Sequence, residues 1–410
     1  MSSRLARIPG ARIGMRYLFT SLGFWVLFNL GTCLWHQHFH VSYFREPYIL
    51  ALTHLAALGW LTTGLMGVIY ATLPAILGGR PRRVRMARVQ YWFQVVGVAG
   101  LALTMDLVSQ TRGRVVFGLL TLGALVIFGH NIAVTVGRGQ QWHLPEAHFV
   151  MAAFYLAITG LIGMSYVFYL NNGLVPQTMM YLKVHAHFAG LGWLALASMA
   201  LTYKLLPLEM GVDNVPQRWA LAASVLINLV FWGVFFGYAY DWPALRVGSA
   251  VLGLAGLVCH ALQVAAIAAR GHGVRARSLP YTLTSCVFGI VATLLALLLT
   301  TGAVGTGFAG EYAYAYVGGI GWFGLYVTGQ MAWLIPLLLH DDAHDGVPEP
   351  GWMSPEFLGL TAGTALVTAG LLADTSLLVA LGAAVNLAAS LLMTVRSVRL
   401  CWAQPAMAER

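Results

Sequence analysis

Two segments of the chain carry nearly the same 21 residues, and each of them begins with a histidine. Residues 54–74 read HLAALGWLTTGLMGVIYATLP, and residues 187–207 read HFAGLGWLALASMALTYKLLP. Ten of the 21 aligned positions are identical, including the leading His54 and His187. A third copy begins at Tyr316 and has a tyrosine in place of the histidine. A repeat at a nearly fixed spacing constrains the architecture more than any single motif does.

The chain is far too apolar for a soluble globular protein. Of its 410 residues, 59% are hydrophobic and 9% are charged, whereas soluble domains carry about 25% charged residues. About 20 apolar residues are needed to cross a bilayer as a helix. Twelve stretches meet this need, at 17–35, 48–73, 90–108, 115–136, 148–170, 184–206, 219–240, 245–268, 281–302, 312–338, 356–373 and 375–396. The sequence therefore predicts an all-α, polytopic membrane bundle that occupies residues 1–410 as one domain.

The repeat spacing divides these twelve stretches into three groups of four. Trp60 and Trp193 are 133 residues apart, and Trp193 and Trp322 are 129 apart. The repeated segment then falls on the second, sixth and tenth helix. We expect three pseudo-symmetric four-helix units, at about 17–136, 148–268 and 281–396. Units with an even number of helices are parallel, and inverted repeats are the commoner transporter signature.

The glycines and prolines of the repeat have a structural interpretation. Each copy contains a Gly-Trp pair, and a proline lies 14 residues after the tryptophan. Glycine allows neighbouring membrane helices to approach closely, and proline ends or kinks a helix. We expect Gly59, Gly192 and Gly321 to pack the repeated helix tightly against its neighbour.

The formal net charge of +9 is explained by arginines at helix ends and does not indicate nucleic-acid binding. Clusters of arginine precede the first stretch and follow the second, eighth and twelfth, which places them all on one side if every stretch spans. Cytoplasmic loops are enriched in Lys and Arg. We therefore expect a bacterial inner-membrane protein with both termini in the cytoplasm and with lipid around it. The first stretch lacks a small-residue cleavage site, which favours an uncleaved helix.

His54, His185 and His187 are expected near the outer ends of their helices, at similar depth. Histidine ligates haem iron and copper, and polar groups inside a membrane are costly and usually functional. Residues two apart on a helix point about 200° apart, so His185 and His187 should serve two different sites. We predict that His54 and His187 clamp a b-type haem, and that His185 faces a second haem or copper ion. The alternative is hydrogen-bonded core histidines.

The segment WHQHFH after the first helix contains His36, His38 and His40. In an extended segment these three side chains would share one face, and three imidazoles suit copper or zinc. The alternative is that they are surface histidines at the membrane interface. Arg45 lies in the same loop, and it either pairs with haem propionates or anchors at the lipid headgroups.

Twelve helices in three units, with histidines placed for haem, resemble catalytic subunit I of the haem-copper oxidases and the related nitric oxide reductases. The resemblance is specific only around His54 and the His-Ala-His of the sixth helix. In that family the second helix supplies a low-spin haem ligand, and a His-x-His helix serves two haems. The family carries this motif on the tenth helix, where the present chain has Tyr314 and Tyr316, and its seventh-helix copper ligands have no counterpart here. The haem- and copper-containing NnrS family is a second candidate.

The resemblance implies a haem protein of respiratory electron transfer, or an oxidoreductase that reduces O₂ or NO. A c-type cytochrome or another redox subunit would be its partner, and a small diatomic molecule its ligand. One alternative is a non-enzymatic membrane protein of the NO response or of copper handling. Another is a transporter in which the histidines are structural.

Overall fold

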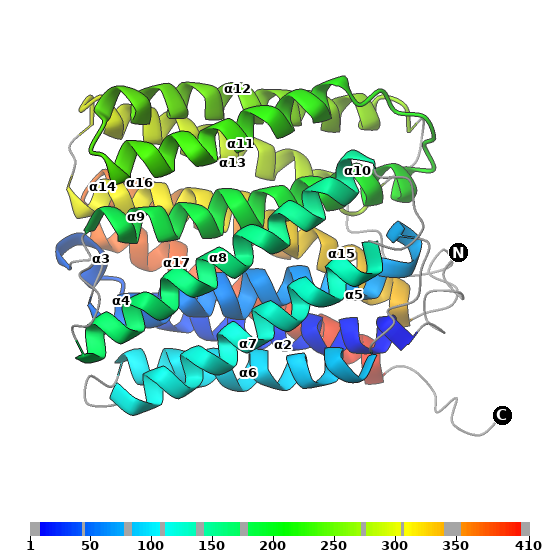
Figure 1. Ribbon diagram of the computed structural model, residues 1–410, viewed down its shortest axis with the longest axis horizontal. Coiled ribbons are helices and arrows are strands. Elements are labelled where there is room, and N and C mark those ends of the chain that lie inside the picture. The colour runs from blue at the N-terminus through cyan, green and yellow to red at the C-terminus, as the bar shows by residue number, and fades with distance from the viewer. Residues whose placement is uncertain are drawn as a thin grey trace.

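The computed structural model describes residues 9–42, 46–77, 84–106, 111–136, 143–172, 179–271, 276–304, 307–339 and 354–402. Within these ranges every regular element is helical, and the long helices run roughly side by side (Figure 1). The first helix begins and the last helix ends at the same end of the bundle (Figure 1). We call this the inner end, following the arginine pattern, and the opposite one the outer end.

Each of the twelve predicted stretches corresponds to one helix or to one composite helix. The single helices are α2 (Pro9–Leu34), α6 (Val84–Asp106), α7 (Thr111–Val136), α8 (Leu144–Asn172), α11 (Arg218–Ala239), α12 (Pro243–Ala268), α13 (Leu279–Thr300), α16 (Pro355–Leu372) and α17 (Ser376–Trp402), together with the short α3 (His38–Val41).

The second, sixth and tenth helices are composite, because each contains an eight-residue π-helical segment. They run α4 (Pro47–His54), η1 (Leu55–Thr62) and α5 (Thr63–Leu77); α9 (Met179–His187), η2 (Phe188–Ala195) and α10 (Leu196–Met210); and α14 (Phe308–Tyr316), η3 (Val317–Gly324) and α15 (Leu325–Leu339).

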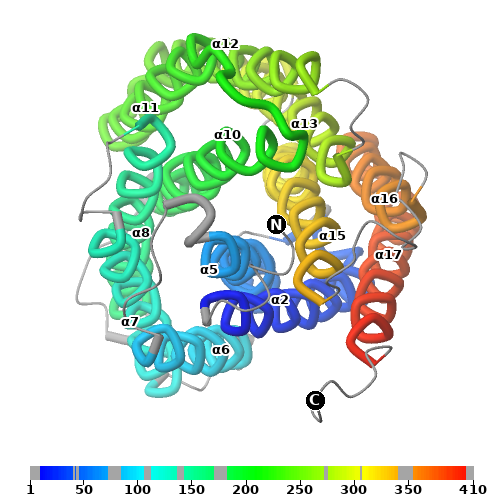
Figure 2. Tube along the Cα trace, turned by 90° about the vertical axis from the view of Figure 1, so that its right-hand side faces the viewer, coloured from blue at the N-terminus to red at the C-terminus, as the bar shows by residue number. Residues whose placement is uncertain are grey.

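The composite helices form the centre of the bundle. A view along the helices places α5, α10 and α15 inside a ring of the other long helices (Figure 2). The three π-helical segments contact one another, and α17 packs against α2 to close the ring. Trp60 and Trp193 of these segments are fully buried. The repeated sequence therefore builds the core of the molecule.

The glycine of each repeat lies directly against an aromatic ring of a neighbouring helix. A Cβ atom on Gly59 would lie 2.7 Å from Phe24 of α2, and one on Gly192 would lie 2.7 Å from Tyr155 of α8. Gly321 has the same relation to Phe288 of α13, also at 2.7 Å. The expectation that these glycines permit close packing is confirmed.

Eleven of the described helices are long and apolar enough to cross a membrane, and α6 is the predicted span that falls outside this set. Its two glutamines face inward: Gln90 accepts a hydrogen bond from the Tyr70 hydroxyl, and Gln94 donates to the Leu58 carbonyl and the Thr63 hydroxyl at 3.1 Å. Its outward residues include Trp92, 59% exposed, and Leu103, 66% exposed. The glutamines lower the mean hydropathy of a helix whose outer face is apolar.

Candidate functional site

His54 and His187 occupy equivalent places, because each is the last α-helical residue before a π-helical segment. The Nδ1 atom of His54 donates to the carbonyl of Leu50 at 2.7 Å, and that of His187 donates to the carbonyl of Lys183 at 2.7 Å. A carbonyl can only accept, so Nδ1 carries the proton in both rings. In a neutral ring the Nε2 atom is then an unprotonated acceptor, which is the form that ligates a metal.

His185 lies close enough to His54 to interact with it electrostatically, although the two come from different composite helices. Its Nδ1 atom is buried with no hydrogen-bond partner, while the backbone of Thr159 lies near the ring. Gly163 of α8 makes room for this imidazole, because a Cβ atom there would lie 3.2 Å from Cε1. The two histidines form what we call the His54–His185 pair.

His187 points to a different place in the bundle. The Tyr314 hydroxyl of α14 donates to its Nε2 atom at 3.1 Å, given the proton on Nδ1. The two rings are stacked with their centroids 5.9 Å apart, and the ring of Tyr238 lies 5.7 Å away. We call this the His187–Tyr314 pair. The imidazoles of His185 and His187 therefore have different neighbours, as their spacing of two residues on one helix predicts.

The contacts of these rings point to a grouping other than the one expected from sequence. His185 interacts electrostatically with His54, while Nε2 of His187 is bonded to Tyr314 of the tenth helix. Both pairs join a residue just before a π-helical segment to a residue two positions earlier in the next composite helix. The sequence could establish that His185 and His187 diverge, but the identity of each neighbour depends on how the helices pack.

The corresponding third pairing would involve Tyr316 and Leu52, and neither carries an imidazole. Both are buried, at 7% and 3% exposure. The Tyr316 hydroxyl accepts a hydrogen bond from Asn386 of α17 at 2.9 Å, and Leu52 packs against α2 at Gly31. An imidazole therefore occupies two of the three equivalent places.

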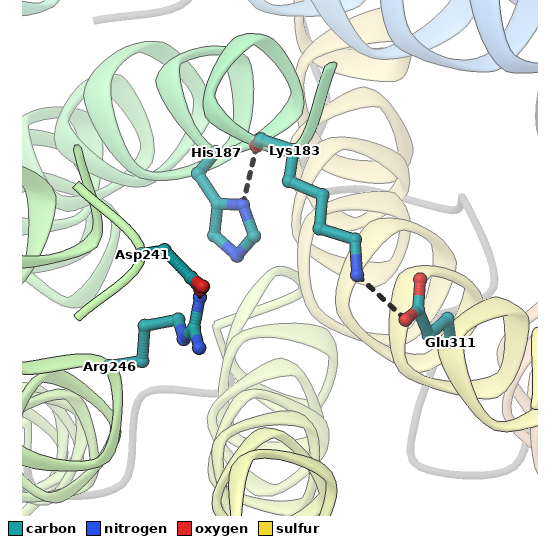
Figure 3. A network of polar contacts seen from close by, with 5 residues as sticks. All are labelled: Lys183, His187, Asp241, Arg246 and Glu311. Carbon is teal, nitrogen blue, oxygen red and sulfur yellow. Dashed lines mark hydrogen bonds and ion pairs between the residues drawn. The ribbon is translucent and has the colours of Figure 1, made fainter. Parts of the chain in front are cut away.

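Two ion pairs lie on either side of the His187 ring, which points from α9 toward the space between them (Figure 3). Lys183 pairs with Glu311 at 2.7 Å and joins α9 to α14. Arg246 pairs with Asp241 at 2.8 Å beyond the end of α11. The Tyr238 ring lies 5.8 Å from the Lys183 ammonium and 5.3 Å from the Arg246 guanidinium. The surroundings of His187 are thus polar and charged.

The predicted metal site at His36, His38 and His40 does not have the assumed backbone. Residues 35–37 form a turn and α3 is helical, so alternate residues do not share a face. His36 bonds to the carbonyl of Cys33 at 2.8 Å, and His38 bonds to the hydroxyl of Tyr48 at 3.1 Å. The side chain of His40 and the whole of Arg45 lie outside the described residues.

Residues that the sequence did not single out complete the surroundings of His187. Tyr314 aligns with His185 in the repeat, and this alignment was the signal that could have identified it. Tyr238 and the Lys183–Glu311 pair carried no such signal. Searches of protein-family models and of curated proteins found no match to the chain.

The donors of the His54–His185 pair have the chemistry that a haem iron requires. Two imidazoles from different helices, one with its Nε2 free to accept, are a donor set that would hold a haem iron and support electron transfer there. Among the described residues, no three His, Cys, Asp or Glu side chains converge in a way that could hold a metal ion. The His54–His185 pair is therefore the candidate cofactor site of this chain.

Proposed function

We propose that the chain is a multi-pass membrane haem protein similar to haem-copper oxidase subunit I, in which His54 and His185 hold one b-type haem. The observation that carries the proposal is the His54–His185 pair, formed by two helices and oriented in part by the bond from His54 to Leu50 at 2.7 Å. Such a haem would supply one-electron redox chemistry. With both axial positions filled by imidazole, it would transfer electrons and not bind a substrate.

The proposed architecture is three four-helix units around a common axis. Three features recur at equivalent residues: a π-helical segment after residue 54, 187 or 316, a glycine packed on an aromatic ring, and contact among the π-helical segments. The His-x-His motif lies in the second unit here and in the third unit of the oxidases. The haem site would accordingly lie between the first and second units.

His187 is the candidate ligand of a second haem or metal, where a diatomic ligand such as O₂ or NO would bind. Its place among charged residues supports this role, since polar groups in a membrane protein usually serve function. Electrons would come from a c-type cytochrome or another redox subunit. The location would be a bacterial inner membrane, with both termini in the cytoplasm.

One observation favours a non-enzymatic alternative. The Nε2 atom of His187 is already bonded to Tyr314, which is what a structural histidine would do. A protein with a single six-coordinate haem could act in the NO response without turning over a substrate. Copper handling loses its main support, because the His36–His40 segment is not extended.

The visible spectrum of the purified full-length chain, produced in haem-replete cells, tests the proposal. We expect a Soret band and the sharp α-band of a low-spin haem. His54→Ala and His185→Ala should each abolish the low-spin signal, and His187→Ala should retain it. A folded but colourless protein would contradict the haem proposal. Loss of the signal in His187→Ala but not in His185→Ala would restore the pairing expected from sequence.

A further inference from the structure

A second group of histidines lies near the inner end of the bundle, far along the helices from His54. His148 is in the second turn of α8, Tyr203 is in α10, and His260 is in α12. They are almost completely enclosed, with exposures of 1%, 8% and 2%. The Tyr203 hydroxyl and the Nδ1 atom of His260 are 3.0 Å apart. His148 contacts the Tyr203 ring at a centroid distance of 6.1 Å and interacts electrostatically with His260.

His148 is unusual because both of its ring nitrogens are buried without a hydrogen-bond partner. A neutral imidazole has one donor and one acceptor, and leaving both unused in a buried site is costly. Buried polar groups in native proteins almost always have a partner, which can be a side chain, a water molecule or an ion. Both ring nitrogens of His148 are therefore available to bind an ion or a hydrogen-bonding molecule.

The first four helices provide a comparison without imidazole. Tyr17 of α2, Tyr70 of α5 and Asn131 of α7 make the corresponding contacts: the two tyrosine rings are 5.6 Å apart, and Asn131 donates to the Tyr70 hydroxyl at 3.1 Å. Tyr70 also donates to Gln90. The asparagine and glutamine satisfy the Tyr70 hydroxyl there. Around Tyr203, the imidazole of His148 takes the place of Tyr17, and the imidazole of His260 takes the place of Asn131.

Two thiols, which are softer donors than imidazole, lie near Tyr203. Cys259, adjacent to His260, and Cys286 of α13 are close enough to Tyr203 to interact with it electrostatically. An oxygen donor is at hand as well, because the phenol of Tyr203 lies 3.0 Å from Nδ1 of His260. Imidazole suits zinc and copper, and a nearby thiol favours the same ions.

We propose that His148, Tyr203 and His260 bind one transition-metal ion of the Zn²⁺ or Cu²⁺ class. Ligands about 2.0–2.1 Å from a tetrahedral ion are about 3.3 Å from each other, close to the separation of Tyr203 and His260. Binding would occupy a nitrogen of His148 and release the phenolic proton of Tyr203. The site is independent of the proposed haem, which lies at the outer end.

Metal retention by the full-length chain tests this site. The protein, purified with a tag free of histidine, would be stripped with a chelator, incubated with Zn²⁺ or Cu²⁺, freed of excess metal and analysed by mass spectrometry. We expect one equivalent per chain. His260→Asn and His148→Tyr, which install the residues of the first comparison group, should each weaken retention by about tenfold or more.

The matched control is His143→Gln, because His143 is exposed and lies close to His148 in the chain. It should retain the metal as the wild type does. Equal retention in wild type and His260→Asn would overturn the proposal, as would equal loss in the control. X-ray absorption of the loaded wild-type protein should show imidazole scattering, and its absence would also overturn it. Iron is counted separately, so a colourless protein leaves this test intact.

Discussion

The direction of each histidine ring is set by a bond within its own helix. His54 and His187 both donate from Nδ1 to the carbonyl four residues earlier, at 2.7 Å. This bond fixes the tautomer and leaves the proton off Nε2 in both rings. In His54 the only hydrogen bond that the described residues give the ring is this one, whereas His187 also meets Tyr314. Both rings make the same bond to the backbone, but Nε2 of His54 is left to accept a ligand, whereas Nε2 of His187 is already bonded to Tyr314.

The bond between Tyr314 and His187 can be removed with little change of shape. Tyr314→Phe should lower the free energy of unfolding by about 1 kcal/mol, the net contribution of one hydrogen bond. It should also expose Nε2 of His187 to carbethoxylation, located by peptide mass spectrometry. Tyr240→Phe is the control, since Tyr240 is 74% exposed. Unchanged reactivity of His187 in Tyr314→Phe would show that another group protects this ring.

The composite helices are the elements that distinguish this bundle. π-Helical segments are rare and often lie at functional sites. Here all three begin one residue after His54, His187 or Tyr316, and all three meet at the centre. The shift in helical phase that they introduce lies between the histidines and the inner half of each helix. The position of the ligands therefore depends on a backbone feature that apolar periodicity does not reveal.

Adding one methyl group tests the close approach of these helices. A Cβ atom at Gly59 would lie 2.7 Å from Phe24, so Gly59→Ala should destabilise the protein by about 1–3 kcal/mol through overpacking. Gly319→Ala is the matched control, because Gly319 also lies in a π-helical segment and has nothing within 4 Å of its would-be Cβ. Thermal unfolding in detergent measures both, and equal stability of the two variants would contradict the packing argument.

At the scale of the whole molecule, the ring of helices combines an apolar exterior with polar groups turned inward. Eleven described helices qualify as spans by length and composition. In α6, the inward Gln90 and Gln94 meet Tyr70 and Thr63, while Trp92 faces outward. A helix of this kind can cross a bilayer when its neighbours satisfy its polar side.

Reporter fusions test whether α6 crosses the membrane. With α6 as a span and the N-terminus inside, the turn after α10 at Gly211 is cytoplasmic and the turn after α11 at Asp241 is external. A fluorescent-protein fusion truncated after Gly211 should fluoresce, and an alkaline phosphatase fusion truncated after Asp241 should be active. The reverse result would mean that α6 does not span.

Much of the element pattern could be predicted, and much of the site could not. Length and hydropathy located all twelve helices, because a membrane helix must satisfy its backbone internally over a fixed thickness. The extended conformation assumed for His36–His40 was wrong, because a short polar segment has no periodicity that separates a strand from a turn and a short helix. Neither Tyr238 nor Glu311 could be assigned to the surroundings of His187, because each lies on a helix that is distant from α9 in the sequence.

The sequence by itself determined that the chain is a bundle of apolar helices, that His54 and His187 are equivalent, and that His185 and His187 diverge. These follow from composition, alignment and helical periodicity, which are local properties. Only the tertiary structure decided that His185 interacts with His54 and that His187 is bonded to Tyr314. Periodicity fixes the angle between two side chains of one helix, but the neighbour that each side chain meets is set by the order and phase in which the helices pack.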